Sequence, residues 1–120
     1  MTGIVFFRSG ERERVCDFYR EHVDAETWLE QPGCTILRYD TFLFGFCDAE
    51  SGENDSEGDG TITFVYDTRE AVDRAYERLA DHARDEPSKN ADYEIYNFFA
   101  DDPEGRMVEC QTFLHPIDPP

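Results

Sequence analysis

The two halves of the 120-residue chain repeat one pattern, and this repeat limits the possible folds more than any single segment does. The matched pairs are Ile4 with Ile62, Phe6 with Phe64, Val15 with Val72 and Tyr19 with Tyr76. The first two pairs are offset by 58 residues and the last two by 57, which predicts one extra residue in the first strand–helix turn. Neither half has enough apolar residues to fold alone, so we expect two similar modules packed around one core.

Apolar periodicity predicts a strand, a helix and further strands in each half. The predicted strands are residues 4–7, 26–30, 35–39, 42–48, 61–66, 93–100 and 107–113, and the predicted helices are residues 11–23 and 68–84. Residues 86–90 read as a connection. The prediction is thus a single domain, residues 1–120, with modules at about 3–48 and 60–114 joined by an acidic linker, residues 49–59.

Charge excludes several classes of partner. The chain carries 28 acidic and 11 basic side chains, a formal net charge of −17, and Lys89 is its only lysine. Nucleic acid and anionic membranes would be repelled. Acidic excess with so little lysine indicates a halophilic protein, because concentrated salt screens the self-repulsion. Residues 1–3 lack the basic and apolar features of a signal peptide, and no apolar run is long enough to cross a membrane, so we expect a cytoplasmic protein.

The four cysteines, at positions 16, 34, 47 and 110, show no C-x-x-C spacing. A cytoplasmic chain of this size with so few cysteines is not a disulfide scaffold. We therefore expect four reduced and mostly buried cysteines.

Two segments carry a family resemblance. Phe18-Tyr19-Arg20 closes the first predicted helix, and residues 99–109 read FADDPEGRMVE. They resemble the helix end and the F-x-x-D-P-x-G-x-x-x-E signature of the vicinal oxygen chelate superfamily, which includes glyoxalases, bleomycin-resistance proteins and extradiol dioxygenases. The resemblance covers residues 3–113. It implies an α+β fold of two βαβββ modules that form an open curved sheet or barrel around a shared pocket, and a homodimer.

The resemblance also implies where a metal would bind. Metal-dependent members take one ligand from the first strand and one from the last strand of each module. The matching positions here are Gly3, Phe44, Thr61 and Glu109, and only Glu109 is a competent ligand. We therefore predict no cofactor, while a divalent metal held at an incomplete site stays an alternative.

Strand alternation predicts the pocket lining. If Glu109 faces inward, so do Met107, Gln111 and Phe113. The predicted binding residues are Phe44, Phe46, Thr61, Thr63, Gln111 and Arg38. The aromatic rings either line the pocket or fill it as core. Glu109 either stays available or pairs with Arg38 or Arg106, and Arg38 could instead bind an anionic group.

Three functions fit this pattern. The first is a metal-free small-molecule binding protein with a degenerate metal site. The second is a lyase, an isomerase or a dioxygenase-like enzyme that uses Glu109 as general base or as remaining metal ligand. The third is a protein whose pocket has closed and which binds a partner.

Overall fold

The computed structural model describes residues 2–49 and 60–119, and these form two units. The elements of the first unit are β1 (Ile4–Ser9), α1 (Arg12–His22), β2 (Glu26–Gln31), β3 (Cys34–Tyr39) and β4 (Phe42–Asp48). Its sheet has the order β1-β4-β3-β2, with β1 parallel to β4 and the other pairs antiparallel.

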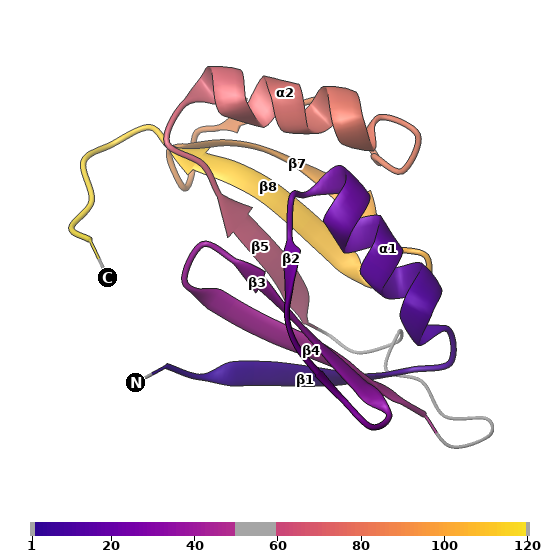
Figure 1. Ribbon diagram of the computed structural model, residues 1–120. Coiled ribbons are helices and arrows are strands. Elements are labelled where there is room, and N and C mark those ends of the chain that lie inside the picture. The colour runs from indigo at the N-terminus through magenta and orange to yellow at the C-terminus, as the bar shows by residue number, and fades with distance from the viewer. Residues whose placement is uncertain (1, 50–59, 120) are drawn as a thin grey trace. The chain divides into compact units, whose positions relative to one another are not determined.

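The second unit repeats this topology (Figure 1). Its elements are β5 (Thr61–Val65), α2 (Arg69–Leu79), β6 (Ser88–Asn90), β7 (Ile95–Asp101) and β8 (Met107–Phe113). The sheet order is β5-β8-β7-β6, again with one parallel pair, β5 and β8. The predicted α+β class with two βαβββ modules is therefore confirmed, and the second module has its full set of strands. Of the predicted linker, residues 50–59 lie outside the described residues.

Each helix packs an apolar stripe on its own sheet. The buried residues are Val15, Cys16, Phe18 and Tyr19 in α1, and Val72, Ala75 and Leu79 in α2. Thr68 is the N-cap of α2, since the amide of Ala71 donates to the Thr68 hydroxyl at 3.1 Å. Neither described helix is long and apolar enough to traverse a lipid bilayer.

Helix α2 ends at Leu79, five residues before the predicted end. The chain that follows pairs with β7 instead. Arg84 donates its amide to the carbonyl of Phe99 at 2.8 Å, and Asp101 donates to the carbonyl of His82 at 3.1 Å. These bonds satisfy backbone groups that a longer helix would have used. Strand β6 lies within residues 86–90, which were predicted to be a connection. A strand of three residues is too short to show the alternation of polar and apolar residues that predicts a strand.

Phe44 and Phe46 belong to the core of the first unit, so the prediction that they line a ligand pocket is wrong. Both side chains are fully buried. Their ring centroids lie 5.3 and 5.4 Å from that of Tyr19, which comes from α1. They therefore lie on the helix side of β4.

The two units repeat with one constant offset along the first strand and the helix. The prediction of one extra residue in the first strand–helix turn is therefore wrong. Phe7, not Phe6, stacks on Phe46 at 5.7 Å, so Phe7 is the counterpart of buried Phe64. The offset is then 57 residues, the same as between the helices. Phe6 instead pairs with Gly45, as Thr63 pairs with Glu109. Gly45 is thus the first-unit counterpart of Glu109.

Gly45 leaves room for an aromatic ring. A Cβ at this position would lie only 2.8 Å from ring carbons of Phe6. In the first sheet, the Phe6 ring therefore covers the position that is equivalent to Glu109 in the second sheet. The two sheets thus differ in chemistry at equivalent positions.

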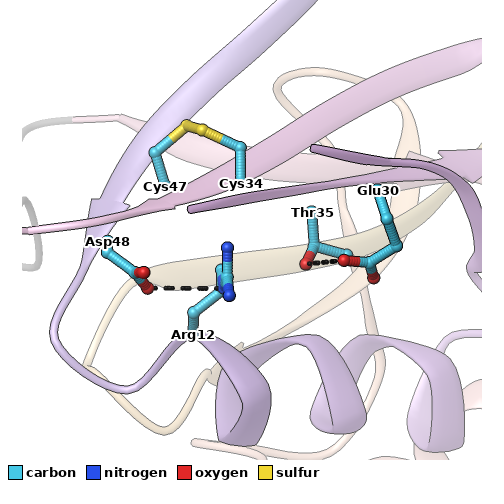
Figure 2. The surroundings of a disulfide bond; sticks show 6 residues. All are labelled: Arg12, Glu30, Cys34, Thr35, Cys47 and Asp48. Carbon is cyan, nitrogen blue, oxygen red and sulfur yellow. Dashed lines mark hydrogen bonds and ion pairs between the residues drawn. A yellow bond between two sulfur atoms is a disulfide. The ribbon is translucent and has the colours of Figure 1, made fainter. Parts of the chain in front are cut away.

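Cys34 and Cys47 form a disulfide, which corrects the expectation of four reduced cysteines. They are directly opposed on the antiparallel strands β3 and β4, with Cα atoms 4.1 Å apart. Figure 2 shows the bridge on one side of these strands and Arg12 of α1 on the other. Cys16 and Cys110 are free and buried, as expected.

The turn Pro103–Arg106 belongs to the first unit. The Glu104 carboxylate accepts from the Ser9 hydroxyl at 2.7 Å, from the Gly10 amide at 2.9 Å and from the Arg106 guanidinium at 2.9 Å. Arg106 also donates to the carbonyl of Arg8. Its guanidinium carbon lies 5.5 Å from the ring centroid of Phe7 and 5.2 Å from that of Phe46. This motif segment thus has a structural role in the first unit.

Candidate ligand pocket on the second sheet

Strand β8 is an interior strand of the second sheet and presents two different faces. Val108, Cys110 and Thr112 are buried on the side where α2 packs. Met107, Glu109, Gln111 and Phe113 alternate with them and remain half-exposed on the opposite side. We call this opposite side the open face of the second sheet. The predicted alternation along this strand is confirmed.

A cavity of about 510 Å³ lies on the open face. We call it the Glu109 pocket, and it is lined by Thr61, Asn90, Tyr93, Ile95, Asn97, Phe99, Met107, Glu109, Gln111 and Phe113. All ten residues come from the second unit. The size and the mixture of apolar walls with a few polar groups are typical of small-molecule sites.

Glu109 is held by neighbours on both sides. The Thr63 hydroxyl on β5 donates to Glu109 Oε1 at 3.0 Å, and Asn97 Nδ2 on β7 donates to Oε2 at 2.8 Å. Both oxygens accept, as those of a carboxylate do. Because the two donors sit on flanking strands of one sheet, the backbone fixes the orientation of the carboxylate.

Both arginines that the sequence offers as partners for Glu109 pair with other carboxylates. Arg106 pairs with Glu104, as described above. Arg38, on β3 of the first sheet, pairs with Glu26 at 3.4 Å. Arg38 is also not among the residues that line the Glu109 pocket, so its predicted part in binding receives no support from this geometry.

The structure brings four of the predicted site residues together. Thr61, Glu109 and Gln111 line the pocket, and Thr63 orients Glu109. Sequence reasoning missed Asn97, Phe99 and the other wall residues contributed by β6, β7 and the turn between them. The alternation of Ile95, Asn97 and Phe99 could have placed them on one face with Glu109, once β7 was paired with β8.

The two free thiols are unsuited to nucleophilic chemistry. Burial raises the pKa of Cys110 to about 12 and that of Cys16 to about 11. Only the thiolate is a strong nucleophile, and at neutral pH both groups are almost entirely protonated.

The residues present do not fit the metal centre of metal-dependent members of the superfamily that the sequence resembles. With the corrected register, the first-unit counterparts of Thr61 and Glu109 are Ile4 and Gly45 instead of the predicted Gly3 and Phe44. Neither isoleucine nor glycine has a side chain that can bind a metal. Among residues 2–49 and 60–119, no group of three or more His, Cys, Asp or Glu side chains is arranged to hold a metal ion.

Comparison of the sequence with family models finds no match, and no curated protein matches the chain. Solved structures do match it. A glyoxalase/bleomycin resistance protein/dioxygenase from Nocardioides has a TM-score of 0.74 and 16% identity over 100% of this chain and 87% of its own. A family enzyme of the same description from Burkholderia phytofirmans has a TM-score of 0.76 and 18% identity over 92% of this chain and 97% of its own.

A lactoylglutathione lyase from Agrobacterium tumefaciens has a TM-score of 0.74 and 17% identity, over 93% of this chain and 92% of its own. At such low identity these likenesses establish the fold and not the activity. They agree with the two βαβββ modules observed here. The chain therefore has the vicinal oxygen chelate fold, that of the glyoxalase/bleomycin resistance protein/dioxygenase proteins.

Proposed function

We propose that the protein binds a small organic molecule in the Glu109 pocket and does so without a metal. The observation that carries the proposal is the oriented carboxylate at the wall of a cavity of about 510 Å³. The Glu109 side chain is half-exposed on the open face, so its carboxylate is accessible to a ligand in the pocket. Two hydrogen bonds fix the orientation of the carboxylate, and the side chain lines the pocket. This arrangement indicates a group that binds a ligand.

A thermal-shift screen of small aromatic and amphipathic compounds tests this proposal. A ligand present at about 100 times its dissociation constant should stabilise the protein by about 2.7 kcal/mol, which raises the melting temperature by several degrees. We expect the shift to fall sharply in Glu109→Gln, which keeps the shape of the side chain and removes its charge.

Glu77→Gln is the matched control, because it removes one exposed carboxylate from α2 and leaves the pocket intact. It should bind like the wild type. If no compound shifts the melting temperature, and Glu109→Gln is as stable as the wild type or more stable, the pocket is not a ligand site. That result would favour a protein that acts through a partner surface.

A second candidate function is catalysis by Glu109. The same geometry favours it, since the carboxylate borders an apolar pocket where a substrate proton could be presented to it. Turnover of a screened carbonyl compound by the wild type and by Glu77→Gln, but not by Glu109→Gln, would establish an enzyme. Binding without turnover would establish a binding protein.

We further propose a halophilic, cytoplasmic homodimer. The net charge of −17 opposes both the compact state and the association of two copies. Large apolar side chains on one face of edge strand β1 supply a surface for association, since Ile4 is 37% and Phe6 49% exposed. Screening shortens the reach of a charge from about 10 Å at 0.1 M salt to about 3 Å at 1 M.

We therefore expect the melting temperature and the dimer fraction to rise together as KCl is added. Differential scanning calorimetry and light scattering measure them, with sucrose as a stabiliser that carries no charge. Equal melting temperatures in dilute and molar KCl would contradict the halophilic proposal. A monomer at every salt concentration would contradict the dimer.

A further inference from the structure

The Glu109 pocket contains a single charged side chain. Its ten lining residues include one carboxylate and no lysine, arginine or histidine. Both residues that hold the carboxylate, Thr63 and Asn97, are neutral. The negative charge of Glu109 therefore has no cationic partner within the site.

The carboxylate also has unused hydrogen-bonding capacity. Two carboxylate oxygens offer about four acceptor positions, and Thr63 and Asn97 fill one on each oxygen. A ligand that donates N–H groups from a charged nitrogen would complete the set. Such charge-assisted bonds are about twice as strong as bonds between neutral groups.

Aromatic rings make up much of the remaining wall. Phe99 and Phe113 line the pocket, and Tyr93, which is 70% exposed, lies at its margin. Ring faces attract cations and also pack against apolar groups. The net charge of −17 further raises the local concentration of cations and lowers that of anions.

From these observations, and resting on the proposed function, we infer the ligand class: an organic primary or secondary ammonium, or an amidinium, attached to an aromatic or branched apolar body. An anionic ligand would be repelled by Glu109. A neutral ligand would remove water from the carboxylate without supplying a charge in return. A quaternary ammonium would contact the rings but could not fill the acceptor positions.

Three probes with one aromatic body test the inference: 1-naphthylmethylamine, 1-naphthylmethanol and 1-naphthoate. Isothermal titration is carried out in about 1 M KCl, where the long-range field is screened and contact pairing remains. We expect the amine to bind about tenfold or more tightly than the alcohol, equivalent to about 1.4 kcal/mol. The naphthoate should bind more weakly than either, and N-trimethylation of the amine should remove most of its advantage.

In Glu109→Gln the amine and the alcohol should bind with affinities within about twofold of each other, while Glu77→Gln should keep the tenfold difference. If the alcohol binds the wild type as tightly as the amine, or if the preference survives in Glu109→Gln, the inferred ligand class is wrong although a binding pocket exists. If none of the probes binds, the inferred ligand class is wrong, and the thermal-shift screen described above decides the proposed function separately.

Discussion

Replacing Arg106 by methionine is expected to lower the free energy of unfolding by about 3–5 kcal/mol, the usual loss when one partner of a buried ion pair is removed. The Arg106 side chain is 4% exposed and that of Glu104 is 8% exposed. Methionine fills part of the space between the rings of Phe7 and Phe46, but it leaves the Glu104 carboxylate buried without a counter-charge. Urea unfolding measures the change.

Two comparisons separate the buried charge from a general loss of packing. The double variant Glu104→Gln with Arg106→Met removes both charges and should recover much of the lost stability. Arg84→Gln breaks the half-exposed pair with Asp101 and should lose less than about 1 kcal/mol. If Arg106→Met is at least as stable as Arg84→Gln, the Arg106–Glu104 pair does not stabilise the first unit in the way described here.

The contribution of Glu104 to the free energy of unfolding should also depend on pH. Burial alone would raise its pKa, but the hydrogen bonds from Ser9, Arg106 and the Gly10 amide outweigh burial and hold the pKa below its ordinary 4.5. A lowered pKa in the folded state means that the stabilisation is complete above that ordinary value and disappears as the pH falls through the folded-state pKa. The difference in stability between wild type and Glu104→Gln should therefore shrink in acid.

Reduction of the Cys34–Cys47 disulfide is expected to destabilise the protein by about 3 kcal/mol, the value for a closed loop of about 15 residues. The sequence separation of the two cysteines is 13. The register of β3 against β4 includes five further residue pairs, so the reduced protein should keep its fold. Urea unfolding with and without reductant measures the effect, and Cys34→Ser with Cys47→Ser is the control that should not respond to reductant.

A thiol count in protein that is acid-quenched directly from cells decides whether the bridge forms there. Two reactive thiols, from Cys16 and Cys110, are expected if it forms, and four would contradict it. The result also bears on the expected cytoplasmic location, because the cytosol of most organisms keeps thiols reduced.

The two modules could be predicted from the sequence because their helices have clear apolar stripes and their strands recur at one spacing. The faces of the strands were predictable only where polar and apolar residues alternate. Strand β8 alternates in this way, and Glu109 and Gln111 were placed correctly. Strand β4 is apolar on both sides up to Cys47, so alternation could not tell the helix side from the other, and Phe44 and Phe46 were misplaced.

The remaining errors involve long-range pairing. A run of four apolar residues, 4–7, fits two registers, and packing of Phe7 on Phe46 selects one of them. The disulfide requires Cys34 and Cys47 to be direct partners, which depends on the hairpin register between β3 and β4. Asn97 became a site residue only through the pairing of β7 with β8.

The most direct test of the central claim is nuclear magnetic resonance of the wild type during titration with 1-naphthylmethylamine. The side-chain NH₂ of Asn97 donates to Glu109 and reports on the carboxylate itself. The account predicts that this signal and the amides of Thr61, Glu109 and Gln111 shift together, with one affinity. Shifts confined to other parts of the chain, with the Asn97 signal unmoved at saturation, would contradict it.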